Sequence, residues 1–187
     1  MGQTPDQLQM FTIGHSNHPL GTFLWLLRQH GITGFQVVRG GDTRQDSVRL
    51  ALEHVRTPRV ITHNAALPFV TPKEIANVAK ESDPCVTTVT PVQQSLCRGG
   101  EYATEMVRPD DLKLINTPQS FDTDLFRDSH RRAFADKVAL RTDCELMMRY
   151  GHAVRFVPGD PCNFKITTQL DVLLAEALIQ HQKQATA

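Results

Sequence analysis

Short runs of apolar, β-branched residues alternate with helical segments along most of this chain, and this alternation constrains the fold more than any other feature. The runs expected to form strands are residues 10–13, 35–38, 59–62, 85–90, 112–115 and 153–157. The segments expected to form helices are residues 20–30, 42–55, 72–80, 122–136, 142–150 and 170–180. Strands that alternate with helices are typical of a mostly parallel sheet whose faces are covered by helices. The sequence therefore predicts an α/β fold.

The composition narrows the class of protein further. A chain of 187 residues suffices for one domain, 1–187, with a hydrophobic core. Its 20 basic and 20 acidic residues cancel, which argues against a nucleic acid or a membrane surface as partner. We see no signal peptide and no apolar run of membrane length, and the four cysteines show no C-x-x-C spacing. We therefore expect a cytoplasmic protein with reduced thiols and no zinc site.

One segment, residues 91–108, interrupts the alternation of strands and helices. It is polar, it contains Gly99 and Gly100 in succession, and it resumes with the strand-like sequence TEMVR. Paired glycines between two short strand-like runs are typical of a hairpin tip. The sequence predicts a two-stranded β-arm that leaves the sheet at this point.

The stretch RVITHNAALPFVT, residues 59–71, indicates a site at the end of a strand. Its β-branched start predicts a buried strand that stops at His63 and Asn64, and the small Ala65 and Ala66 permit close approach of a ligand. In open α/β sheets, ligands bind at the carboxyl ends of the strands. Asn64 stands where a nucleotide enzyme would place a carboxylate to hold Mg²⁺.

A glycine turn, RGGDTRQDS at residues 39–47, follows the predicted strand 35–38. Glycines let backbone groups approach a ligand closely, so Gly41 with Asp42 and Ser47 could read the edge of a nucleotide base. The alternative is a turn in which Asp42 caps the next helix.

A lysine and two threonines are the remaining candidates from the residues alone. Lys165, in NFKITT, is expected at the end of a short strand before a helix capped by Thr167 or Thr168, where it could meet a phosphate or simply face solvent. Thr117, in TPQSF, and Thr142, in RTDCE, are both expected at helix starts, where capping explains them as well as ligand binding does.

Taken in order, five motifs resemble a known family. The motifs are GGDTRQDS, THNAALPFV, NTPQSFD, RTDCELMMRYG and VPGDPCNFKITTQLDVLLAEALI. Over residues 36–182 this order is similar to the cytidylyltransferases that use 2-C-methyl-D-erythritol 4-phosphate, an isoprenoid precursor, or ribitol 5-phosphate. The resemblance implies a Rossmann-like nucleotidyltransferase fold and a reaction of CTP with a polyol phosphate to give CDP-polyol and pyrophosphate.

The resemblance also implies roles for single residues. Gly41, Asp42 and Ser47 match positions that bind the cytosine of CTP. Lys165 matches the lysine that meets phosphate, and Asn64 matches the residue that holds Mg²⁺, the metal expected for this family.

The polyol phosphate is implied to bind at three further positions, Thr142, Arg108 and Thr117. The arm at 91–108 resembles the hairpin that these enzymes exchange across a homodimer, so Arg108 would serve the partner's site.

The sequence departs from the family pattern at the phosphate-binding positions. The family carries an aspartate where Asn64 stands, an arginine where Leu67 stands, and a glycine-rich triphosphate loop at its start that is not visible here. Fixed charges supply much of the stabilisation in phosphoryl transfer. We therefore expect impaired catalysis, and as an alternative a non-catalytic protein, or a truncated relative, that still binds a cytidine nucleotide.

The first 35 residues are atypical of the family. Residues 11–32, FTIGHSNHPLGTFLWLLRQHGI, resemble the opening of a different, uncharacterised domain that begins TIGHSN. The pair His15 and His18 in this segment could hold a metal or phosphate, but an H-x-x-H pair on a loop is a weak pattern, and a simple polar turn explains it better.

Overall fold

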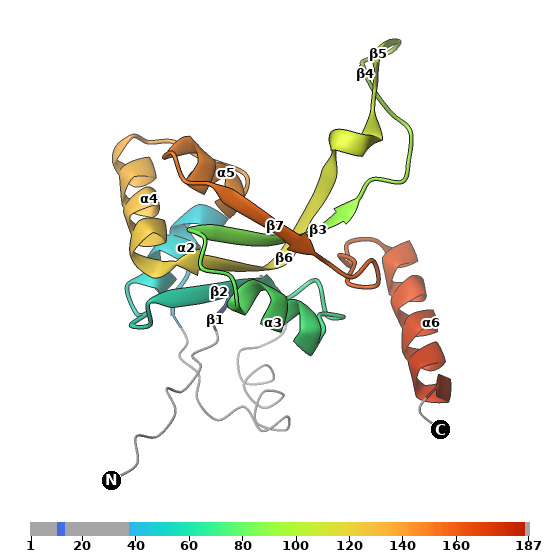
Figure 1. Cartoon of the computed structure of the whole chain (residues 1–187), viewed down its shortest axis with the longest axis horizontal. Coiled ribbons are helices and arrows are strands. Elements are labelled where there is room, and N and C mark those ends of the chain that lie inside the picture. The colour runs from blue at the N-terminus through green and yellow to red at the C-terminus, as the bar shows by residue number, and fades with distance from the viewer. Residues whose placement is uncertain (1–10, 14–37, 186–187) are drawn as a thin grey trace.

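The computed structural model describes residues 11–13 and 38–185, and these form a five-stranded sheet of order β1-β2-β6-β3-β7 (Figure 1). The strands are β1 (Phe11–Ile13), β2 (Arg59–Asn64), β3 (Cys85–Pro91), β6 (Lys113–Asp122) and β7 (Val154–Pro158). Strand β6 runs antiparallel to β2 and β3, whereas β1 pairs with β2 and β7 with β3 in parallel. Four of these strands thus share one direction, which confirms the predicted mostly parallel sheet.

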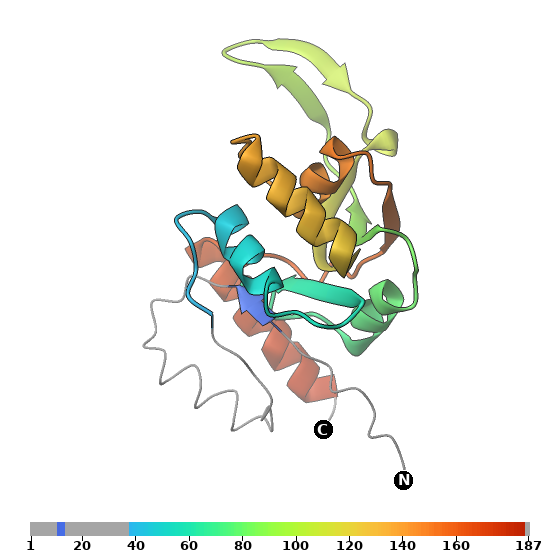
Figure 2. The same cartoon turned by 90° about the vertical axis from the view of Figure 1, so that its left-hand side faces the viewer.

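Helices cover both faces of the sheet (Figures 1 and 2). One face carries α2 (Arg44–Leu52), α4 (Thr123–Ala135) and α5 (Asp143–Arg149), and the other carries α3 (Pro72–Ala79). The larger core lies under α2, α4 and α5, where the rings of Phe121 and Phe126 stack with centroids 4.0 Å apart. A smaller core of Val78, Val86 and Val157 holds α3 against the sheet.

The last helix, α6 (Gln169–Ala185), stands apart from the other helices in Figure 1. Leu170, Leu173 and Leu174 are exposed on it. None of the helices in the described residues is both long and apolar enough to cross a membrane.

The predicted arm is present as β4 (Leu96–Gly99) and β5 (Ala103–Val107), an antiparallel pair that projects away from the sheet (Figure 1). A Cβ atom on Gly99 would lie 2.1 Å from the carbonyl oxygen of Tyr102, so only glycine fits this turn. A short 3₁₀ turn, η1 (Pro109–Asp111), then leads into β6.

Four local expectations were wrong. Helix α2 is capped by Thr43 rather than Asp42, because the Thr43 hydroxyl accepts the Asp46 N–H at 3.0 Å, and the helix ends at Leu52 rather than near residue 55. The TPQSF sequence continues β6 instead of starting a helix, and α4 is capped by Asp122. The residues 163–168 form no strand.

Several expectations fall on residues outside those described. They are the helix at 20–30, most of the strand at 35–38, the histidine pair of the TIGHSN segment, and the first residue of the strand at 10–13. Residues 11–13 do form the expected strand β1.

Candidate active site at the carboxyl end of β2

Strand β2 ends in a tight turn built by Asn64. The Asn64 side-chain oxygen Oδ1 accepts the Ala66 N–H at 3.0 Å, and its carbonyl oxygen accepts the Leu67 N–H at 2.9 Å. An asparagine that bonds the backbone two residues ahead stabilises a turn in this way. Leu67 is only 3% exposed, so it anchors the turn in the protein interior.

A bulge in β6 brings Thr117 against this turn. In the β3–β6 ladder Thr87 pairs with Gln119, and the next pair is Val89 with Ile115. More residues of β6 than of β3 therefore lie between these two pairs. The residues between them, which include the cis peptide Thr117–Pro118, therefore leave the ladder.

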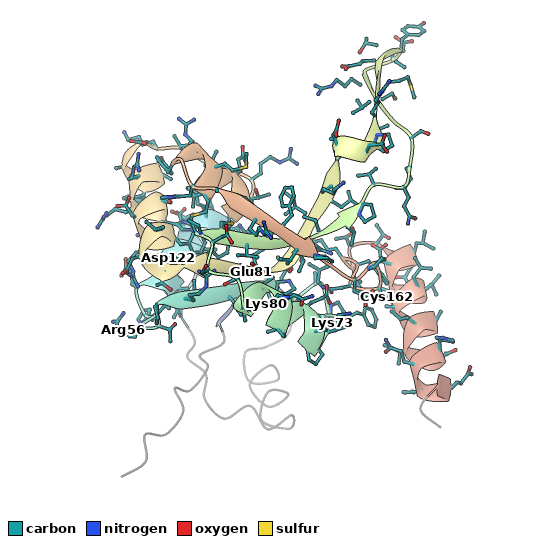
Figure 3. All side chains as sticks on the ribbon, in the orientation of Figure 1. Arg56, Lys73, Lys80, Glu81, Asp122 and Cys162 are labelled. Atoms are coloured by element: carbon teal, nitrogen blue, oxygen red, sulfur yellow. The ribbon has the colours of Figure 1, made fainter. Side chains whose placement is uncertain are left out.

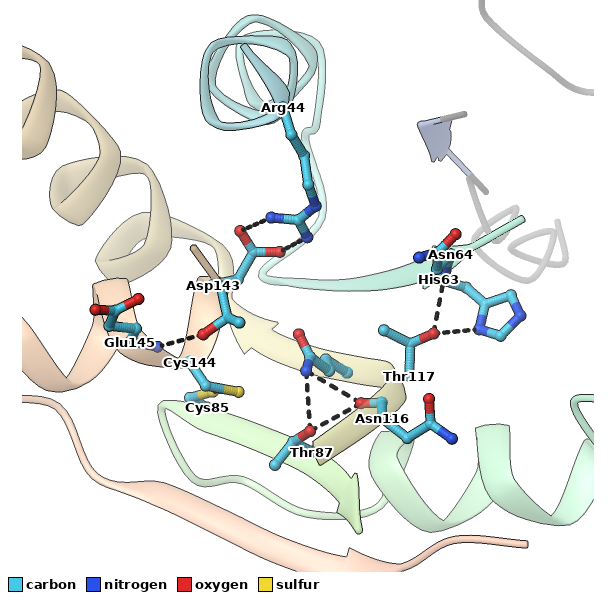
Figure 4. A network of polar contacts seen from close by, with 12 residues as sticks. Arg44, His63, Asn64, Cys85, Thr87, Asn116, Thr117, Asp143, Cys144 and Glu145 are labelled. Carbon is cyan, nitrogen blue, oxygen red and sulfur yellow. Dashed lines mark hydrogen bonds and ion pairs between the residues drawn. The ribbon is translucent and has the colours of Figure 1, made fainter. Parts of the chain in front are cut away.

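The side chain of Thr117 is consequently directed at β2. Its hydroxyl accepts the Asn64 N–H at 3.1 Å and lies 3.0 Å from His63 Nδ1 (Figure 4).

His63 completes this contact as a neutral ring. Its Nε2 lies 2.8 Å from the Leu67 carbonyl oxygen, which can only accept, so Nε2 carries the proton and Nδ1 accepts from Thr117. Burial lowers the pKa of His63, which agrees with an uncharged ring. The Thr117 hydroxyl thus both accepts and donates within the protein, where it fixes the end of β2.

A second polar network fills the bulge from the β3 side. The Thr87 hydroxyl donates to the Asn116 carbonyl at 3.0 Å, and Gln119 Nε2 donates to both the Thr87 hydroxyl at 3.0 Å and the Asn116 carbonyl at 3.1 Å (Figure 4). Thr87 and Gln119 are buried. These bonds satisfy a carbonyl that the interrupted ladder would otherwise leave unpaired.

The loop between β7 and α6, residues 159–168, carries Lys165, and this lysine loop contacts the same turn. The Ile166 N–H donates to the Ala66 carbonyl oxygen at 2.8 Å, so the backbone beside Lys165 is joined to the Asn64 turn. Lys165 itself is exposed. Asn64 and Lys165, which are far apart in the sequence, therefore belong to one edge of the sheet, where ligands bind in such folds.

The glycine loop comprises residues 39–47, and its first residues fold onto the first turn of α2, which its last residues form. The Gly41 N–H donates to Ser47 Oγ at 3.1 Å, and the Ser47 hydroxyl donates to the Thr43 carbonyl at 2.9 Å. A Cβ atom on Gly41 would lie 2.5 Å from the Cβ of Asp46, so a larger residue cannot occupy this conformation. The structure thus brings Gly41 and Ser47 together, with Asp42 exposed between them.

An ion pair joins the glycine loop to the start of α5. Arg44 donates to both carboxylate oxygens of Asp143, at 3.0 and 2.5 Å (Figure 4). Asp143 is buried and Arg44 about half exposed, so the two-pronged geometry compensates the buried charge.

The other two predicted polyol-phosphate residues lie at exposed element starts. Thr142 caps α5, since its hydroxyl accepts the Glu145 N–H at 3.0 Å. Arg108 lies at the base of the arm, just before η1. Within this single chain neither of them is bonded to the Asn64 turn.

The described residues at this edge of the sheet do not fit a Mg²⁺ ion held by the protein. Magnesium in nucleotide enzymes is usually held by one or two carboxylates together with phosphate oxygens. The end of β2 offers an amide whose oxygen is already bonded to Ala66. The described residues also contain no group of three or more His, Cys, Asp or Glu side chains placed to hold a metal.

Several residues that build the site carried no functional signal in the sequence. These are Glu74, Thr87, Asn116, Gln119 and Asn163. The spacing Thr71-x-x-Glu74 is that of a helix capping box and could have singled out Glu74. The others depend on pairings between distant segments.

A mostly parallel α/β sheet with polar loops at the carboxyl ends of its strands is an architecture that nucleotide-binding proteins, the nucleotidyltransferases among them, use to hold their ligands. The family model for 2-C-methyl-D-erythritol 4-phosphate cytidylyltransferase (IspD) matches residues 7–181, and the chain belongs to this family. The match includes the segment 11–32, and the comparisons do not support a separate origin for it.

Curated relatives agree with this assignment. The chain is 40% identical over 149 residues to the 2-C-methyl-D-erythritol 4-phosphate cytidylyltransferase of Deinococcus radiodurans and 40% over 147 residues to that of Salinibacter ruber. The matches cover 78% and 76% of this chain but only 64% and 62% of those proteins. The comparisons give no support to the expected impairment of catalysis.

Solved structures show the same fold. The 2-C-methyl-D-erythritol 4-phosphate cytidylyltransferase of Thermus thermophilus superposes with a TM-score of 0.72 at 36% identity, over 78% of this chain and 73% of that one. The 4-diphosphocytidyl-2C-methyl-D-erythritol synthase of Anaerococcus prevotii gives a TM-score of 0.77 at 24% identity over 86% and 76%, which shows the fold alone.

Proposed function

We propose that this chain transfers a cytidylyl group from CTP to 2-C-methyl-D-erythritol 4-phosphate, giving CDP-methylerythritol and pyrophosphate. The observation that carries the proposal is the hydrogen bond from Ile166 to Ala66. It joins the lysine loop to the strand-end turn, so two motifs of the family meet at the edge where an α/β sheet binds its ligands. Relatives at 40% identity are named for this activity.

The reaction needs positioning and charge more than covalent help from the protein. An oxygen of the polyol phosphate attacks the α-phosphorus of CTP, and the bond from that phosphorus to the bridging oxygen breaks. The electron pair leaves with pyrophosphate. We assign to Lys165, whose side chain is exposed, the stabilisation of the negative charge that spreads over the phosphate oxygens.

Cytosine binding is assigned to the glycine loop. Gly41 and Asp42 are exposed at its surface, whereas the Ser47 hydroxyl holds the loop in shape through Gly41 and Thr43. Backbone groups and one carboxylate suffice to read the donor and acceptor pattern of a base edge.

The polyol phosphate is assigned to Thr142, Thr117 and Arg108. Thr142 and Arg108 are exposed, and Arg108 lies at the base of the projecting arm, which supports a homodimer in which it reaches the partner's site. In this chain the Thr117 hydroxyl is occupied by His63 and Asn64, so we assign it to shaping the site beside the substrate.

The test is calorimetric titration with CTP, CMP and cytidine. We expect CTP to bind the wild type, and Lys165→Met to weaken CTP at least about tenfold while leaving cytidine unchanged, because a charged hydrogen bond to phosphate is lost. Lys80→Met is the matched control, since Lys80 lies at the far end of α3. Equal affinities of CTP and CMP would instead indicate a protein that binds cytidine nucleotides without catalysing transfer.

A further inference from the structure

Glu74 is a buried carboxylate that does more than cap its helix. It is 3% exposed at the start of α3, where its Oε2 accepts the Thr71 N–H at 3.0 Å and the Thr71 hydroxyl at 3.2 Å. These bonds complete the capping box of α3. The other oxygen, Oε1, is directed away from the helix and accepts the Asp160 N–H at 3.0 Å and Asn163 Nδ2 at 3.3 Å.

Asp160 and Asn163 belong to the loop that carries Lys165. Figure 3 labels Lys73 on α3 and Cys162 on this loop, the two segments that Glu74 links. Burying a carboxylate is unfavourable unless its oxygens are hydrogen-bonded, and a cap needs only one of them. The second oxygen is therefore committed to the loop.

The same loop is held at Asn163 by two further bonds. Asn163 Nδ2 donates to the Thr117 carbonyl at 3.0 Å, and the Asn163 carbonyl accepts from Asn116 Nδ2 at 2.8 Å. Beyond the lysine, Ile166 is bonded to Ala66. Lys165 thus lies between two points at which hydrogen bonds hold the loop, one to Glu74 and one to the Asn64 turn. Its own side chain is exposed.

We propose that Glu74 is a positioning residue that holds Lys165 in place to meet the triphosphate of CTP. This inference rests on the proposed function, since it assigns Glu74 a role only through Lys165. A displacement of about 1 Å at a charged group can change a rate or an affinity by orders of magnitude. A carboxylate whose second oxygen fixes the loop provides that precision.

The experiment compares Glu74→Gln with Thr71→Ala by calorimetric titration of CTP and cytidine. In Glu74→Gln a single amide oxygen must serve the donors that two carboxylate oxygens share in the wild type, so the cap and the loop compete for it and the loop contact is weakened. Thr71→Ala weakens the cap of the same helix but retains both Glu74 bonds to the loop. We expect Glu74→Gln to weaken CTP about tenfold more than Thr71→Ala does, with cytidine within about twofold of the wild type.

The decisive readout is the double variant with Lys165→Met. Where Glu74 acts through Lys165, Glu74→Gln changes CTP affinity less than about twofold in the Lys165→Met protein. An equal loss with and without Lys165, or an equal loss in Glu74→Gln and Thr71→Ala, would overturn the inference. If Glu74→Gln does not fold, Asn163→Ala replaces it, because it removes the loop's side of the same contact.

The two proposals fail in different ways. A wild type that does not bind CTP overturns the proposed function and this inference with it. If Lys165→Met binds CTP as tightly as the wild type does, the role of Lys165, and hence that of Glu74, is overturned. The proposal of cytidylyl transfer itself then still stands.

Discussion

His130 makes the stability of this protein depend on pH in a defined direction. Its ring is 1% exposed on α4, and neither ring nitrogen has a hydrogen-bond partner in the part of the chain that the structure describes. Burial lowers its pKa to about 4 from the ordinary 6.5. The charged groups that act on it are Asp143 and Asp46, which raise the pKa, and Arg44 and Arg49, which lower it.

The sign follows from proton binding in the two states. Between pH 6.5 and about 4 the unfolded chain binds a proton at this histidine and the folded protein does not, so stability falls as the pH falls. Each pKa unit corresponds to about 1.4 kcal/mol. The contribution of His130 is therefore fully present above pH 6.5, and about 2 kcal/mol of it is lost by pH 5 and about 3 kcal/mol by pH 4.

Urea unfolding of the wild type and of His130→Leu at pH 7.5 and pH 5 measures this difference. Leucine fills a similar volume without a titrating group. The free energy of unfolding of the variant therefore falls by about 2 kcal/mol less than that of the wild type between pH 7.5 and pH 5. His181→Gln is the control, because His181 is an exposed histidine on α6, whereas His130 is buried on α4. The same pH dependence in wild type and His130→Leu would refute the reasoning.

Three further predictions concern the site and its support. Gly41→Ala forces the glycine loop away from α2 and lowers the affinity for CTP, measured by calorimetry, at least about tenfold. Gly100→Ala at the arm tip, where the space around the glycine is open, leaves that affinity unchanged. Asn64→Asp keeps the turn, since a carboxylate also accepts the backbone N–H, and makes CTP binding depend on Mg²⁺; an unchanged Mg²⁺ dependence would contradict the assigned position. Arg44→Met leaves the buried carboxylate of Asp143 unpaired and lowers the free energy of unfolding, measured in urea, by about 2 kcal/mol. Arg98→Met, which breaks the exposed ion pair of the arm, lowers it by less than about 1 kcal/mol, and equal losses in the two variants would refute this prediction.

The sequence predicted β2, β3 and β7 well, because each is a short β-branched run with a clear boundary. It did not predict the length of β6, since TPQSF within that strand was expected to start a helix. The arm was also predictable, since its glycine pair interrupts the alternation. The direction of β6 was not, because the residue pattern of a strand does not encode which way its neighbours run. A register shift between β3 and β6, not any local signal, removes Thr117 from the ladder and turns it toward Asn64.

Within the site, local features could be predicted and long-range ones could not. The capping role of Thr142 follows from its position before α5. At α2 two adjacent residues could both cap, and the choice of Thr43 over Asp42 depended on backbone geometry that the sequence leaves open. The bonds from Glu74 to the lysine loop join residues whose proximity only the folded sheet creates.

Release of pyrophosphate from CTP tests the central claim most directly. With purified protein, CTP and 2-C-methyl-D-erythritol 4-phosphate, the account predicts pyrophosphate and CDP-methylerythritol in equal amounts, with no release when the polyol phosphate is omitted. Absence of both products at saturating substrates, while calorimetry still shows bound CTP, would contradict it and identify a protein that binds the nucleotide without transferring it.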